Sequence, residues 1–145
     1  MIYTIILVCK RKTNGTIISE INIGIVFFNV KTTCMKYEKN IALISILNDC
    51  IIACSQCAIA CLNEENIKMM VPCIKLNIDC ADICRLTASL LSRDSEQSHY
   101  LLGECGEVCK KCADECEKHR DMEHCEICAE ACYKCAMYVG EMALI

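Results

Sequence analysis

The chain has 145 residues, 17 of them cysteine, and its formal net charge is −4. This length fits one domain with a short appendage. The negative balance, with no basic face visible, excludes the electrostatic attraction on which nucleic-acid binding depends. Hydrophobic residues make up 54% of the chain, and because that count includes cysteine, part of the core must consist of sulfur.

The cysteine content would indicate a disulfide scaffold in a short secreted chain. Here the count is odd and the spacing is helical. The short apolar run 2–8 precedes the basic cluster 10–12 instead of following it, so no secretory signal is visible. No segment shows the uninterrupted apolar length of a membrane span. We therefore expect a cytoplasmic protein, without a membrane partner, whose thiols are reduced and available to metal.

Residues 1–34 differ in composition from the rest, being rich in Ile, Val and Thr. The pattern predicts strands over Tyr3–Lys10 and Thr16–Val30, with Asn14-Gly15 as a hairpin signal. Strands without further partners are marginal. Our hypothesis is that Met35 is the true start and that 1–34 is a non-native extension; the alternative is a weak hairpin. Residues 35–145 form the expected metal-binding domain.

Four helical segments follow, over about 38–62, about 69–91, from Asp94 as N-cap, and from about residue 121. Each carries a stripe of apolar or cysteine residues at steps of three and four, which keeps them on one helix face. Gly103 and Gly106 in the third segment suggest close helix approach. Short connections make neighbours antiparallel. The predicted fold class is all-α: an up-down-up-down four-helix bundle with a cysteine-lined core.

In this topology fifteen cysteines stack in four layers along the bundle axis. The second layer lacks a fourth thiol, and the second helix offers Leu76 or Asn77 there. Beyond the fourth layer every stripe becomes apolar, as at Leu47, Leu102 and Val139, so hydrophobic packing closes that end. From the open end, the layers are Cys61, Cys73, Cys116 and Cys125; Cys57, Cys112 and Cys128; Cys54, Cys80, Cys109 and Cys132; and Cys50, Cys84, Cys105 and Cys135.

A column of thiolates is a soft metal site that selects Cu(I), Zn(II) or iron–sulfur clusters. Zinc would use four ligands and leave the other cysteines unexplained. The cysteine run typical of ferredoxins is absent. Cu(I) accepts two or three thiolates, and one Cu(I) per thiolate neutralises the charge of the column in its apolar core. Fewer Zn(II) ions could do so too, but they would need tetrahedral geometry. We therefore expect multiple Cu(I) ions, bound to thiols that are protonated in the metal-free state.

The open end of the column continues into His119 and His124, with Met122 between them. Imidazole and thioether are metal ligands, so this end is the expected mouth through which copper enters and leaves. The structural alternative for the two histidines, solvated helix termini, has equal weight. His99 is expected on the surface.

From about residue 48 to 137 the chain resembles the cytosolic bacterial copper storage proteins, a cysteine-rich four-helix-bundle family. The resemblance implies Cu(I) storage, with the fifteen cysteines as ligands, His119 and His124 at the mouth, and often a homotetramer. Cys9 and Cys34 lie outside it and receive no role. The matching stretches are DCIIACSQCAIAC (49–61), PCIKLNIDCADIC (72–84), ECGEVCKKCADEC (104–116) and HCEICAEACYKCA (124–136).

Two other functions stay open from the sequence: an iron–sulfur electron-transfer protein and a zinc-stabilised interaction module. An enzyme is not expected, because no nucleophile–base pair or phosphate-binding loop is visible. A copper chaperone or a chelator is the expected partner that delivers the metal.

Overall fold

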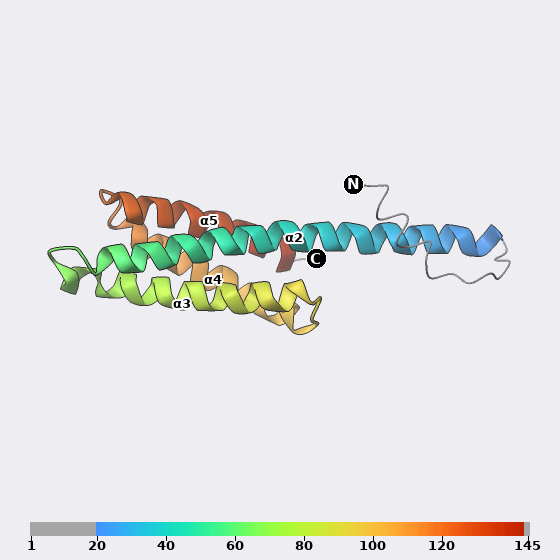
Figure 1. The fold of residues 1–145 in the computed structure, drawn as a ribbon, viewed down its shortest axis with the longest axis horizontal. Helices are drawn as coiled ribbons and strands as arrows, with labels where there is room; N and C mark the ends of the chain where they lie inside the picture. The colour runs from blue at the N-terminus through green and yellow to red at the C-terminus, as the bar shows by residue number, and fades with distance from the viewer. Residues whose placement is uncertain (1–19, 144–145) are drawn as a thin grey trace. The chain divides into compact units, whose positions relative to one another are not determined.

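The structure, a computed structural model, describes the backbone of residues 20–143 and the side chains of residues 37–143. Within that range the chain is helical and contains no strand (Figure 1). The helices are α2 (Glu20–Cys61), α3 (Ile67–Ser92), α4 (Gln97–Glu117) and α5 (Glu123–Ala143). The predicted all-α class is confirmed.

The predicted strand over Thr16–Val30 is wrong where the structure describes it, because α2 already begins at Glu20. The β-branched residues there favour a strand locally, but extending an existing helix costs less than nucleating a new element. The other predicted strand, Tyr3–Lys10, and the Asn14-Gly15 turn lie outside the described residues. The chain divides into two compact units, Met1–Lys36 and Tyr37–Ile145, and the second contains the bundle.

Short connections at 62–66, 93–96 and 118–122 reverse the chain between consecutive helices (Figure 1). α4 packs against both α3 and α5. The helix expected to start with Asp94 as its cap begins instead at Gln97. Asp94 has a φ of 50°, and the Ser95 hydroxyl oxygen accepts the Gln97 backbone N–H at 3.3 Å. The predicted up-down-up-down bundle is therefore formed with slightly shifted helix ends.

The apolar end of the bundle is packed as predicted: Leu47 and Val139 are fully buried, and Leu102 is 4% exposed. The two glycines of α4 do not mark an unusually close helix contact. A Cβ at Gly103 would meet nothing within 4 Å, and one at Gly106 would lie 3.7 Å from Val139 Cγ1, an ordinary packing distance. Stability at this end thus comes from ordinary side-chain burial.

The segment Tyr37–Cys61 is long and apolar enough to cross a membrane, contrary to the sequence expectation, and it is the one such helix in the described range. Its cysteines are fully buried against the other helices of the bundle. The core helix of a bundle meets the same length and composition criteria, and packing explains the 44% of this apolar window that is buried.

Candidate metal centre

The fifteen cysteines between residues 50 and 135 are all fully buried and all free. Each helix contributes its stripe to a shared axis, as the three- and four-residue spacing predicted. Fifteen reduced thiols without contact to solvent form the core of the protein, where they pack as small hydrophobic side chains.

The sulfur atoms lie in contact along the whole axis. Near the mouth, Cys73 Sγ lies 3.9 Å from Cys61 Sγ and 3.6 Å from Cys116 Sγ. At the other end of the column, Cys84 Sγ lies 3.5 Å from Cys109 Sγ, which lies 3.6 Å from Cys135 Sγ. These separations allow neighbouring thiolates to share a metal ion with only small rotamer changes.

The predicted flat layers are staggered in the structure. Cys125 was placed beside Cys61, and its sulfur lies 3.9 Å from that of Cys57 in the next predicted layer. Cys50 Sγ of the fourth predicted layer likewise lies 3.6 Å from Cys132 Sγ of the third. The thiols therefore form one continuous column in which groups of three or four can hold a metal ion. The groups are Cys50, Cys54, Cys80 and Cys132; Cys50, Cys84, Cys109 and Cys135; Cys54, Cys112, Cys128 and Cys132; Cys57, Cys61, Cys73 and Cys125; and Cys57, Cys116 and Cys128.

Asn77 occupies the gap in the second layer and is fully buried. Its amide oxygen accepts hydrogen bonds from Cys128 Sγ at 2.9 Å and from Cys112 Sγ at 3.4 Å. Its amide nitrogen donates to the Cys73 carbonyl at 2.9 Å and to Cys57 Sγ at 3.4 Å. Both the oxygen and the nitrogen of the amide thus have hydrogen-bond partners in the column. The oxygen is also an uncharged potential metal ligand beside two thiols.

The thiols nearest the mouth differ in acidity. Hydrogen bonds from Cys116 and Cys57 lower the pKa of Cys73 from 9.0 to about 3, and Asn77 Nδ2 donates to the same sulfur at 3.3 Å. Burial, followed by the charge of Cys73, raises the pKa of Cys61 to about 11. The same two causes raise the pKa of Cys125. Among the thiols at this end, the hydrogen bonds therefore favour negative charge on Cys73 over Cys61 and Cys125.

The two predicted mouth histidines lie at the open end of the column. His124 Nε2 lies 3.6 Å from Cys61 Sγ and 3.8 Å from Glu64 Oε1. His119 is 9% exposed, and its Nε2 lies 4.0 Å from Glu115 Oε1. His124 is therefore in direct contact with a column thiol, whereas the imidazole of His119 lies beside the Glu115 carboxylate. His99 is exposed, as expected.

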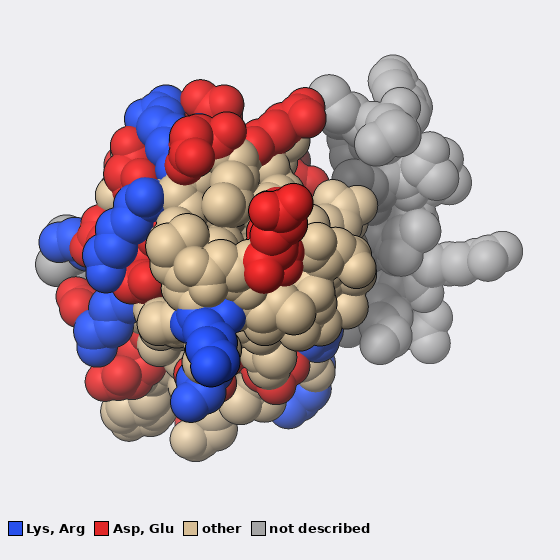
Figure 2. Space-filling model, turned by 90° about the vertical axis from the view of Figure 1, so that its left-hand side faces the viewer, with Lys and Arg blue, Asp and Glu red and all other residues tan. Residues whose placement is uncertain are grey.

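Figure 2 views the molecule from the end that carries the 62–66 and 118–122 connections. Acidic and basic side chains are interspersed there with uncharged surface, and no broad basic face is visible. At the 118–122 connection, Arg120 contacts Glu117 at 2.7 Å and Glu126 at 3.3 Å. These pairs raise the pKa of Arg120 and connect the end of α4 to the start of α5.

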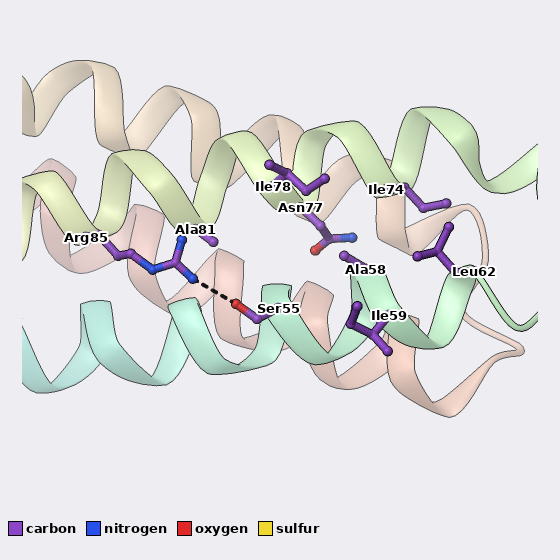
Figure 3. Close-up of a pocket in the computed structure, with 9 residues that line it drawn as sticks. All are labelled: Ser55, Ala58, Ile59, Leu62, Ile74, Asn77, Ile78, Ala81 and Arg85. Atoms are coloured by element: carbon purple, nitrogen blue, oxygen red, sulfur yellow. Dashed lines mark hydrogen bonds between the residues drawn. The ribbon is translucent and has the colours of Figure 1, made fainter.

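An apolar groove of about 250 Å³ lies between α2 and α3 on the side of the bundle (Figure 3). The side chain of Asn77 reaches into it from α3, and Arg85 donates to the Ser55 hydroxyl across it at 3.1 Å. None of its lining residues is a cysteine. The groove therefore offers no thiol to a metal, and the metal centre is the axial column.

A four-helix bundle whose axis is lined by buried, reduced thiols is a protein that binds soft metal ions. The family model for copper storage proteins matches residues 36–144. The chain belongs to the copper storage protein family, which confirms the resemblance seen in the sequence.

Similar proteins agree with this assignment. The cysteine-rich protein YhjQ of Bacillus subtilis (strain 168) is 38% identical over 102 residues, which are 70% of this chain and 94% of YhjQ. The Cu(I)-bound copper storage protein BsCsp3 has a TM-score of 0.69 and 37% identity, covering 72% of this chain and 98% of its own. A cytosolic copper storage protein from Streptomyces lividans, solved with five coppers, has a TM-score of 0.73 and 37% identity, covering 77% and 97%.

Proposed function

We propose that this protein stores Cu(I) in the cytosol by binding many ions to the fifteen core thiols. The observation that carries the proposal is the continuous column of buried, free thiols. Each Cu(I) that replaces a thiol proton leaves the column neutral, so ions can be added one after another without burying net charge. The solved relatives with bound copper support the same reading. Storage of this kind requires no catalytic group.

Anaerobic titration of the metal-free protein with Cu(I), against a competing chelator, tests the proposal. Uptake should approach one ion per thiol, because every thiol has sulfur or amide neighbours within bonding reach of a shared ion. The loaded protein should be colourless, whereas an iron–sulfur protein is brown. Saturation at one or two ions per chain would contradict storage.

Copper is proposed to enter and leave beside His119 and His124. The contact between His124 Nε2 and Cys61 Sγ supports a ligand that passes metal to the first thiols. The double variant His119→Ala with His124→Ala should change the rates of loading and removal more than the capacity. His99→Ala is the matched control, because that histidine is exposed and outside the column. Equal rates in all three proteins would argue against this route.

The functional unit is proposed to be residues 35–145. The family match begins at residue 36 and the compact unit with the bundle begins at Tyr37. A chain starting at Met35 should therefore keep the copper capacity of the full chain. A loss of capacity would give the first 34 residues a part in binding.

Assembly into a homotetramer is proposed from the family resemblance. Outward-facing side chains such as Ile59 (62% exposed), Met137 (56%) and Ile127 (53%) provide apolar surface for such contacts. Light scattering of the purified protein gives the oligomeric state directly, and a monomer at all concentrations would exclude the tetramer. Delivery of copper by a chaperone or a chelator fits a column whose mouth is the accessible end.

A further inference from the structure

Four of the fifteen thiols form a compact group to which three helices contribute. Cys50 and Cys54 of α2, Cys80 of α3 and Cys132 of α5 are fully buried, and their four sulfurs all lie within 4.8 Å of one another. We call them the central quartet. Because three helices contribute, the arrangement is a product of the fold and not of one helical turn.

Five of the six sulfur–sulfur distances within the central quartet are close to the edges of one regular tetrahedron, and the sixth, between Cys54 and Cys80, is within 4.8 Å. Cys50 Sγ lies 4.0 Å from Cys54 Sγ, 3.8 Å from Cys80 Sγ and 3.6 Å from Cys132 Sγ. Cys132 Sγ lies 3.4 Å from Cys54 Sγ and 4.0 Å from Cys80 Sγ. A tetrahedral ion with metal–sulfur bonds of about 2.3 Å, the length typical of zinc, needs sulfur–sulfur edges of about 3.8 Å. Five of the six edges are thus already close to the length that zinc requires.

We propose that the central quartet is a closed tetrahedral site for one divalent d¹⁰ cation, with zinc as the occupant, in the copper-free protein. Cu(I) is satisfied by two or three thiolates and does not need four sulfurs at equal distances. Zinc does need them, and among the described residues five sulfur pairs of the quartet are hydrogen-bonding contacts, against three in each of the other four-thiol groups. This site does not depend on copper storage, since it uses only the geometry of the metal-free thiols.

The charge of such a site is stabilised by hydrogen bonds from neighbouring thiols. Because zinc binds cysteine as thiolate, Zn²⁺ entering the quartet releases four protons and leaves a site with a net charge of −2. Two thiols outside the quartet donate to it: Cys84 Sγ to Cys50 Sγ at 4.0 Å and Cys128 Sγ to Cys54 Sγ at 3.8 Å. Outer hydrogen bonds of this kind orient ligands and stabilise their charge.

Occupancy of the quartet has two consequences. An ion held by α2, α3 and α5 together stabilises the folded state, because the unfolded chain offers no preformed site. It also competes with Cu(I), since all four of its ligands belong to the copper column. The zinc form is therefore a starting state from which copper loading displaces one divalent ion.

The test uses the full chain, metal-free and anaerobic, titrated with Co²⁺ as a visible stand-in for Zn²⁺ and then with Zn²⁺. We expect one Co²⁺ per chain, bound with release of about four protons and with the strong visible bands of a tetrahedral site and sulfur-to-cobalt charge-transfer bands. Zn²⁺ should then displace Co²⁺ without further proton release. Absence of these bands in the wild-type protein would overturn the proposal.

Two serine variants locate the site. Cys80→Ser removes a ligand that belongs to the quartet and to no other group, and it should weaken Co²⁺ binding at least about tenfold. Cys105→Ser is the matched control, because Cys105 is equally buried but belongs to none of the four-thiol groups, and it should keep the spectrum. Cys54→Ser repeats the first test should Cys80→Ser lose its helical circular dichroism. An unchanged spectrum in the quartet variants would place the ion elsewhere and refute the site, whereas low Cu(I) uptake with an intact cobalt spectrum would refute storage alone.

Discussion

Replacing Asn77 separates the role of its hydrogen bonds from the role of its volume. The residue is fully buried, and its two shortest hydrogen bonds, to Cys128 Sγ and to the Cys73 carbonyl, are both 2.9 Å. Neutral hydrogen bonds contribute about 0.5–1.5 kcal/mol each, so these two contribute about 1–3 kcal/mol. Removing the carboxamide also leaves a cavity of roughly 40 Å³, which costs about 1 kcal/mol more. Asn77→Ala should therefore destabilise the metal-free protein by about 2–4 kcal/mol.

Asn77→Leu should behave differently. Leucine fills the space, and burying it contributes about 1.5–3 kcal/mol, which offsets the lost hydrogen bonds. The thiols that no longer have the amide oxygen as acceptor are weak hydrogen-bond donors, so losing these hydrogen bonds costs little stability. We expect the stability of this variant to lie within about 1.5 kcal/mol of the wild type.

Urea unfolding followed by far-ultraviolet circular dichroism measures both variants, because the chain has no tryptophan for fluorescence. Thr87→Ala is the control: Thr87 is equally buried on α3, but its hydroxyl donates to its own helix, to the Ile83 carbonyl at 2.8 Å. It should cost about 1 kcal/mol. Equal stability of the alanine and leucine variants would refute the packed, doubly bonded amide that the structure shows.

Three further predictions concern acidity, capacity and helix stability. The pKa of Cys61 is raised from 9.0 to about 11, so the folded state favours the protonated thiol. This contribution to stability is complete below pH 9.0 and is lost as the pH rises through 11. The urea midpoint of the metal-free protein should therefore fall over this pH range, and a constant midpoint would contradict the raised pKa. Asn77→Cys supplies the missing thiol of the second layer and should raise Cu(I) uptake by about one ion in the chelator titration. Unchanged uptake would contradict the idea that Asn77 occupies the place of a copper ligand. Gly103→Ala meets no atom within 4 Å and should stabilise α4 by about 0.5–1 kcal/mol, measured as a higher thermal midpoint; a lower one would show that the position is not open.

Most of the metal centre could be predicted from the spacing of the cysteines. Steps of three and four residues define one helix face whatever the details of packing, so the inward stripes and the buried thiols followed from the sequence. The choice between Leu76 and Asn77 could also have been made. From Cys73, the steps through Asn77 to Cys80 and Cys84 are four, three and four, the regular alternation of a heptad, whereas Leu76 breaks it. Of these two residues, Asn77 is the fully buried one.

The stagger of the column could not be read from the spacing. It depends on the axial offset between helices, which the connections and the packing of all side chains set together. A shift of half a turn, about 2.7 Å, moves Cys125 from the level of Cys61 to a level between Cys61 and Cys57, with no change in either stripe. The helix over residues 20–30 could not be predicted for a different reason. The β-branched side chains there favour a strand locally, but these residues extend the helix that continues to Cys61, and this continuity outweighs the local preference.

The structure accounts for how a core made of ligands can be stable without metal. Protonated thiols are small, apolar and weakly hydrogen-bonding, so the column packs as a hydrophobic core, and the apolar end around Leu47 and Val139 adds burial that is independent of copper. Copper then exchanges with protons on sulfurs that are already 3.4–4.0 Å apart. Loading therefore needs rotamer changes and proton release instead of refolding. A loose, metal-dependent fold would gain more stability from each ion, but it would expose its thiols whenever it was empty.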